Sequence, residues 1–123
     1  MLTAPLPAES LATVSRGLVQ LLRHRTGRGP TEARVSWAGE DALLALFEGG
    51  YTKVEETLVA GGHRDKALAY RQALLDALES ELCAVVEDAL GRPVHAVVAR
   101  PHRDLGVTAV VFVLARAGGG LPG

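Results

Sequence analysis

The sequence of 123 residues predicts one α+β domain in two layers, an antiparallel four-stranded sheet with helices on one face. Apolar residues recur at helical spacing near the start and in the middle of the chain. Two pairs of short segments with strand patterns, each pair joined by a turn, flank the middle helices. The resulting order is α-β-β-α-α-β-β, which lets two hairpins form one sheet. We expect an ordered core over residues 9–115 and a disordered Gly-rich tail over 116–123.

The first helix is expected over residues 10–25. Ser10 is a suitable N-cap, and Gly27 is suited to the left-handed conformation that follows many helix ends. Between them, apolar side chains recur every three or four residues and therefore share one face. They are Leu11, Val14, Leu18, Leu21 and Leu22.

The first hairpin follows directly. Residues 31–38 alternate, with Ala33, Val35 and Trp37 on one side and polar residues on the other, which is typical of a half-buried strand. The letters GED at 39–41 predict a turn, and the apolar segment 42–48 is expected to be the second strand.

A capping box predicts the start of a short helix over 53–60. Thr52 and Glu55 have the spacing at which each side chain can satisfy a backbone N–H of the first turn. Gly61 and Gly62 then interrupt the helical pattern.

One long helix is expected over 65–90, ended by Gly91, because apolar residues recur along a single face of this segment. The chain then closes with a second hairpin. Its strands, 93–101 and 107–115, are rich in β-branched residues, and the letters HRDLG between them predict a turn.

Composition excludes several classes of protein. Thirteen basic and fourteen acidic residues leave a net charge of −1, which argues against non-specific nucleic-acid binding. Cys83 is the only cysteine, so no intrachain disulfide can form and a cytoplasmic location is the default. The first ten residues lack a secretory-signal pattern. The longest apolar run, 107–115, is about half of the roughly 20 residues that span a bilayer, so we expect no direct membrane insertion.

The Gly-Arg-Gly-Pro segment supports two interpretations. Gly27 and Pro30 can simply end a helix and begin extended chain. Alternatively, backbone N–H groups of a Gly-rich turn flanked by arginines could bind a small anion or a nucleotide. The candidate anion- or partner-binding residues are Arg23, Arg25, Gly27, Arg28 and Gly29. The segment is not a P-loop, since it lacks the Lys-Ser/Thr end.

No catalytic constellation is evident, and we expect neither an enzyme nor a cofactor. The letters HRDL at 102–105 occur without the other kinase motifs and fit a solvated turn. The four histidines lack metal-ligand spacing, so no metal site is predicted. Cys83 has no nearby base in the sequence and fits a small, partly buried apolar role.

Charge is unevenly distributed along the chain. From Arg16 to Arg34 there are five arginines and one acid, whereas from Asp76 to Asp88 there are five acids and no base. Glu87 and Asp88 fall in the last turn of the predicted long helix, where the macrodipole disfavours negative charge. Two interpretations are open: each acid faces a cation, or the acids form a solvated surface.

The length of the predicted helix suggests a homodimer. About 25 residues span roughly 38 Å, more than the roughly 19 Å width of a four-stranded sheet. The overhanging apolar side chains could pack against a symmetry mate and bring the acidic end close to the arginines of the other chain. Alternatively, the first helix covers them within one chain. The candidate interface residues are Leu74, Leu78, Val85, Val86, Glu87 and Asp88.

The ordered set of segments resembles the MpsC-like family, long described as a domain of unknown function. The resemblance covers about residues 9–115, and its most specific pieces are Gly27 to Pro30 and Thr52 to Leu58. It implies the soluble component of a sodium-translocating, membrane-potential-generating system whose other components are membrane proteins linked to ion movement and inorganic-carbon supply. It implies no catalytic residues. We therefore expect a non-enzymatic accessory subunit that contacts membrane transport proteins, and an anion- or nucleotide-binding regulatory module is the alternative.

Overall fold

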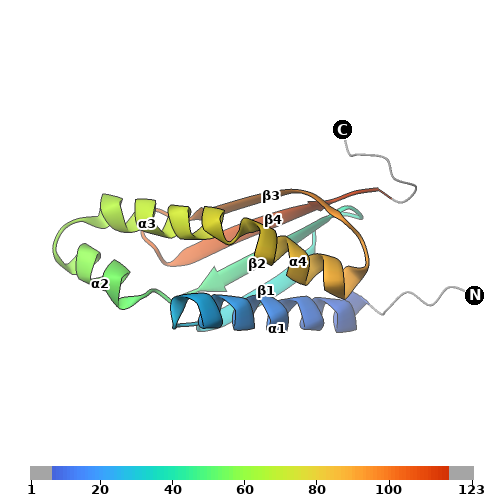
Figure 1. The fold of residues 1–123 in the computed structure, drawn as a ribbon, viewed down its shortest axis with the longest axis horizontal. Helices are drawn as coiled ribbons and strands as arrows, with labels where there is room; N and C mark the ends of the chain where they lie inside the picture. Colours follow the sequence, from blue (N-terminus) through green and yellow to red (C-terminus); the bar gives the residue numbers. More distant parts are fainter. Residues whose placement is uncertain (1–6, 117–123) are drawn as a thin grey trace, which may run out of the picture.

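The computed structural model describes residues 7–116, which form two layers, a four-stranded antiparallel sheet and a layer of helices on one of its faces (Figure 1). The fold class and the order of elements predicted from the sequence are confirmed. Of the tail expected to be disordered, residues 116–123, all but Arg116 lie outside the described residues. The elements are α1 (Pro7–Thr26), β1 (Glu32–Trp37), β2 (Ala42–Glu48), α2 (Lys53–Ala60), α3 (Arg64–Ala77), α4 (Glu79–Leu90), β3 (Val94–Pro101) and β4 (Val107–Leu114).

The two hairpins join through their second strands, which gives the strand order β1-β2-β4-β3. β2 and β4 therefore lie in the centre and β1 and β3 form the edges. In the central pair Leu44 lies opposite Val111 and Leu46 opposite Ala109. A register shift between Val94 and Ala96 marks an irregularity at the start of β3.

The core lies between the helices and one face of the sheet. Alternate residues of the central strands are buried, and they meet the apolar faces of α1 and α4. This arrangement follows from the periods of two and about 3.6 residues seen in the sequence. The buried cluster comprises Val14, Leu18, Leu22, Leu43, Ala45, Phe47, Leu78, Leu82, Val86, Val110, Phe112 and Leu114.

The long helix predicted over 65–90 is instead two helices with a break at Leu78, and Figure 1 shows α4 running at an angle to α3. Leu78 has φ −94° and ψ 2°, and its N–H donates to the carbonyls of both Leu74 and Leu75, at 3.1 and 3.2 Å. The bend keeps Leu75 and Leu82, on either side of the break, buried. Sequence periodicity does not distinguish a straight helix from a bent one, because both keep the same face toward the core.

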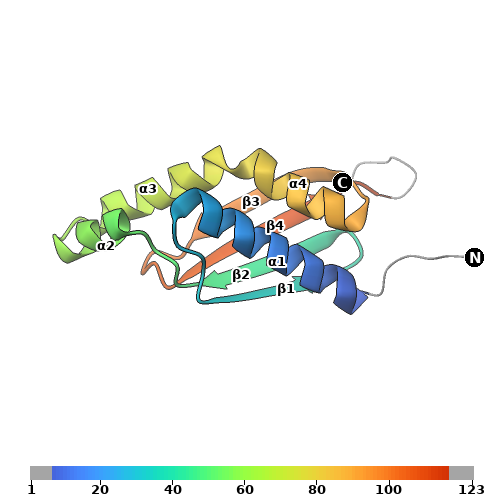
Figure 2. The ribbon, with the colours of Figure 1, turned by 60° about the horizontal axis from the view of Figure 1, so that its bottom comes forward.

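The helices form two pairs. α1 lies alongside α4 over the sheet, while α2 packs on α3 beyond the β3–β4 turn (Figures 1 and 2). Gly17 allows the close approach of α1 to α4, since a Cβ there would lie 2.6 Å from Cγ1 of Val85. The length of α3 that extends past the sheet is therefore covered by α2.

Candidate functional site

Gly27 ends α1 in the way the sequence predicts. Its φ of +82° is left-handed, and its N–H donates to the Arg23 carbonyl at 2.9 Å. The Thr26 hydroxyl donates to the Leu22 carbonyl at 2.7 Å and so satisfies another carbonyl in the last turn of the helix.

The arginines of the predicted anion site are engaged by the chain itself. Arg25 pairs with Glu81 at 2.6 Å, and Arg28 donates to the Glu56 carboxylate at 2.8 Å and to the Tyr51 carbonyl at 3.1 Å. The side chain of Arg23 lies against Gly29, where a Cβ would come within 3.2 Å of it. These contacts link α1 to α4 and the loop to α2, so the arginines have structural roles. Anion binding at this loop stays a prediction.

A second glycine pair, missed by the sequence reasoning, holds the loop in place. Gly49 and Gly50 both have positive φ, +68° and +78°. A Cβ on Gly50 would lie 2.8 Å from the backbone of Pro30, and one on Gly49 would lie 2.6 Å from the Thr31 hydroxyl. Both positions therefore require glycine, and the connection after β2 packs directly on the one before β1.

Glu55 and Arg71 form a buried ion pair between α2 and α3. Both N–O distances are 2.6 Å, and the two side chains are 0% and 6% exposed. The Arg71 guanidinium also lies 4.8 Å from the centre of the Tyr51 ring, a cation–π contact. The capping box is confirmed, because Glu55 also accepts the Thr52 N–H at 2.8 Å.

The sequence carries a local signal for this pair. Arg71 lies midway between Ala67 and Leu75, at helical spacing, and all three are buried. An arginine within an apolar stripe indicates a buried cation that needs a carboxylate partner.

A hollow of about 380 Å³ lies beside the ion pair, between α2 and the β3–β4 turn. Its walls include Tyr51, Glu56, Arg64 and Leu105. Burial raises the pKa of the Tyr51 hydroxyl, an effect that the nearby Thr108 side chain opposes. The Tyr51 oxygen has no partner at hydrogen-bond geometry among the described residues.

The described residues hold no grouped metal ligands, and the Cys83 thiol is not activated. Over residues 7–116, no three His, Cys, Asp or Glu side chains are grouped to hold a metal ion. Burial raises the pKa of the Cys83 thiol, and Glu87 and Glu79 raise it further, which disfavours a reactive thiolate.

The predicted helix interface is largely covered within the chain. Leu78 and Val86 are buried in the core, and Leu74 and Val85 pack against it. The expectation that these four side chains extend past the sheet and pack against a second copy is therefore wrong for Leu78 and Val86. α1 lies over this part of α4, as in the alternative interpretation.

The acids at the end of α4 form no ion pair with any residue that the structure describes. The Glu87 carboxylate instead accepts the Val94 N–H at 2.7 Å, which satisfies the first backbone donor of β3. Asp88 is exposed and makes no ion pair with any described residue.

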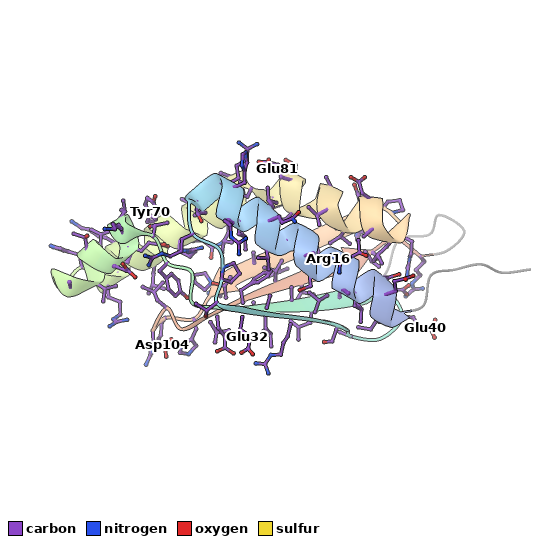
Figure 3. All side chains as sticks on the ribbon, turned by 90° about the horizontal axis from the view of Figure 1, so that it is seen from below. Arg16, Glu32, Glu40, Tyr70, Glu81 and Asp104 are labelled. Atoms are coloured by element: carbon purple, nitrogen blue, oxygen red, sulfur yellow. The ribbon has the colours of Figure 1, made fainter. Side chains whose placement is uncertain are left out.

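Within residues 7–116, the opposite face of the sheet carries no helix. The four helices of this part of the chain lie on one side, and in Figure 3 Glu32 of β1 points away from them. An antiparallel sheet with one covered face normally alternates apolar and polar residues. Here the central strands are apolar on both faces. The apolar residues of this uncovered face, which we call the open sheet face, are Ala42, Leu44, Leu46, Ala96, Val98, Val107, Ala109, Val111 and Val113.

The open sheet face is charged at one end. Arg34 pairs with Glu48 at 3.1 Å, Glu32 lies beside them at the β1 edge, and Arg100 lies at the β3 edge. A shallow hollow of about 730 Å³ lies between Glu48, Arg100 and the β3–β4 turn. Val98 is 60% exposed in the middle of β3. A contiguous apolar surface with a charged rim is typical of a protein interface.

The sequence signal for this face was present in β2 and β4. The runs ALLALF and AVVFVL are continuously apolar, a pattern that indicates strands buried on both faces.

Comparison with known proteins gives one family. A family model described as "Na+-translocating membrane potential-generating system (MpsC)" matches residues 9–116. Neither the curated proteins nor the solved structures give a significant match. Among the helices of the described part of the chain, none has the length and apolar character needed to cross a membrane.

Proposed function

We propose that this chain, which belongs to the MpsC family, is a non-enzymatic accessory subunit acting through protein contacts in a Na+-translocating, membrane potential-generating system. The link to that system comes from the description of the family. The mode of action is supported by the open sheet face, an apolar surface that no element of residues 7–116 covers.

The proposal places the protein in the cytoplasm, at the membrane only through its partners. The membrane transport proteins of such a system, including those that supply bicarbonate, are the expected context. The cost of leaving the open sheet face in water supports this role, since burying apolar area contributes roughly 25 cal/mol per Å². Leu44 and Leu46 are not among the apolar residues that pack against the core cluster. Core packing therefore does not explain why these two positions are apolar.

Co-purification tests the proposal. Tagged protein recovered from gently solubilised membranes of its native host should carry Na+-transport components with it. Leu46→Lys should remove them, because a lysine in the centre of the open sheet face cannot be buried without a partner. The matched control is Val54→Lys on α2, which is 49% exposed and belongs to the helical side. If neither the parent nor either variant recovers a membrane transport protein, the proposed function is contradicted.

A further inference from the structure

We propose that the free edge of β3 binds an added strand, a basic cytoplasmic segment of a membrane transport protein in which lysine or arginine alternates with apolar residues. The inference rests on the proposed function for the source of this segment. The site is separate from the open sheet face. It is the groove between the edge of β3 and the helices α3 and α4, which both lie along that strand (Figure 1).

The outer edge of β3 offers backbone hydrogen bonds. Among the described strands, β3 pairs only with β4. The His102 N–H donates to the Val107 carbonyl at 2.7 Å, which makes these two residues a hydrogen-bonded pair. Alternate residues of β3 therefore bond to β4, and the backbone groups of Val97 and Ala99 point outward. Gln72 of α3 donates to the Ala99 carbonyl at 2.9 Å, which agrees with this orientation and leaves the N–H groups of both residues free to donate to a strand.

Two side chains mark the ends of this free edge. Gln72 binds the Ala99 carbonyl at one end, and the Glu87 carboxylate accepts the Val94 N–H at 2.7 Å at the other. The stretch between them is about five residues long, roughly 17 Å at about 3.3 Å per residue. A short strand of about this length, the usual size of a strand in a protein, therefore fits the edge.

The groove along this edge is acidic. It consists of two adjoining hollows of about 210 and 490 Å³, which share Asp76, Glu79 and Val97. Glu87 adds a third carboxylate to the larger hollow, and none of the described residues that line either hollow is a lysine or an arginine. None of the three carboxylates forms an ion pair with a described residue. The charge of the groove is therefore complementary to a cationic segment. The other polar side chains of the lining are Ser80, Cys83 and His95.

Strand geometry determines which side of the added segment carries the cations. Val97 and Ala99 pack against the core cluster, so their side chains face the helix layer. Residues of the added strand opposite them face the same layer, where Asp76 and Glu79 lie. The residue between them faces the other side of the sheet, beside Val98, which is 60% exposed on the open sheet face. The edge therefore selects cations on one side of the segment and apolar side chains on the other.

A second copy of this chain is a poor occupant of the edge. Pairing of β3 with β3 of another copy about a two-fold axis would bring the acidic grooves of the two copies together, and like charges repel. β3 also presents Val97 and Ala99, and no cation, to the helix side. Cytoplasmic loops of membrane proteins, by contrast, carry an excess of lysine and arginine. Binding by strand addition is an established way for an exposed sheet edge to recognise an extended segment.

The first experiment titrates the purified chain with a fluorescent synthetic peptide of about seven alternating lysine and valine residues. Binding should be saturable and should weaken as the salt concentration rises. Glu79→Lys should raise the Kd by roughly tenfold or more, because Glu79 lines both hollows. The matched control is Asp88→Lys, which makes the same change of charge at an exposed position of α4 outside the groove and should bind like the parent.

Circular dichroism and melting temperature verify that both variants are folded. A peptide of the same composition with its lysines and valines in two separate blocks should bind at least about tenfold more weakly, because it cannot place all its cations on one side of a strand. A parent chain that shows no saturable binding, or an equal loss in the two variants, would overturn the proposal.

The second experiment tests whether the peptide binds as a strand. Hydrogen exchange followed by amide NMR should become slower at Val97 and Ala99 when the alternating peptide is saturating, because their N–H groups then donate to the added strand. The amides of Ala33 and Val35, on the edge strand β1 at the other side of the sheet, should exchange at an unchanged rate. Binding that leaves the exchange of Val97 and Ala99 unchanged would mean that charge alone holds the peptide, and strand addition would be overturned.

The inference and the proposed function can fail separately. If Glu79→Lys recovers membrane transport proteins as well as the parent does, the groove is not their binding site and the inference is overturned, while the proposed function stands. If the peptide binds as a strand but the parent recovers no membrane transport protein, the proposed function is overturned together with the source of the segment. The preference of the β3 edge for an alternating basic strand would then stand without that source.

Discussion

The Arg71 guanidinium and the Glu55 carboxylate form two hydrogen bonds of 2.6 Å in the interior of the protein. The same carboxylate caps α2 through the Thr52 N–H, so one side chain both begins that helix and attaches it to α3. Among the described residues, α2 has a second ion pair to another segment, between Glu56 and Arg28, but that pair is exposed.

Removing one charge of this pair should be strongly destabilising. Glu55→Gln leaves the Arg71 guanidinium buried without a counter-charge and should lower the free energy of unfolding by about 3–5 kcal/mol. Urea denaturation measures the loss. The control is Glu56→Gln, which removes the exposed partner of Arg28 and should cost about 0–1 kcal/mol. Similar losses in the two variants would contradict the buried role of Glu55.

The N-cap hydroxyl makes a smaller contribution. In Thr52→Ala the Glu55 N–H loses its acceptor, which lies at 3.2 Å, and the variant should be less stable by about 1 kcal/mol. The comparison is a thermal melt beside Thr57→Ala, an exposed position of the same helix that should be unaffected or slightly stabilised. An unchanged midpoint for Thr52→Ala would mean that the cap has no energetic role.

Close packing of α1 on α4 can be tested at Gly17. Alanine normally improves a helix by about 1 kcal/mol over glycine. At this position its methyl group would lie 2.6 Å from Val85, so overpacking should outweigh propensity and destabilise the protein by about 1–3 kcal/mol. The double variant Gly17→Ala/Val85→Ala should recover much of the loss. A stabilised Gly17→Ala single variant would show that the helices are not in close contact.

The β3–β4 turn should respond to acid. The Gly106 N–H donates to the Asp104 carboxylate at 2.7 Å and, with His102 beside it, holds the pKa of Asp104 below its usual value. Because the pKa is lowered in the folded protein, the ionised carboxylate stabilises the turn fully at pH values above the ordinary Asp pKa of about 4. This stabilisation is lost as the pH falls through the lower pKa that Asp104 has in the folded protein. Amide NMR of Gly106 during acid titration measures the transition, which Asp104→Asn should abolish.

Much of the fold could be predicted from the sequence because local signals and tertiary structure agree. The capping box at Thr52 and Glu55, the left-handed Gly27 and the alternation in β1 each depend on neighbouring residues, and each is found as expected. The break at Leu78 depends on how one helix fits both the sheet and α1, and no proline or glycine marks it.

The candidate site was less predictable for a related reason. The arginine-rich sequence around Arg28 suggested an anion site. In the structure Arg28 pairs with Glu56, which is 28 positions away in the sequence, and Arg25 pairs with Glu81, which is 56 positions away. Long-range pairing of this kind leaves no local pattern. The open sheet face did leave one, in the continuously apolar runs 42–47 of β2 and 109–114 of β4.

The break at Leu78 divides the protein into regions of different resistance to opening. α4 is held by the sheet and α1, whereas α2 and the first part of α3 extend beyond the sheet and are held to each other by the Glu55–Arg71 pair. Among the described residues, none of α2 and none of α3 before Leu74 belongs to the core cluster or packs against it, so the amides of that helical hairpin should exchange with deuterium through local opening. Those of α4 and the central strands should exchange only through global unfolding. Leu78 then marks the boundary between two cooperative units within a single domain.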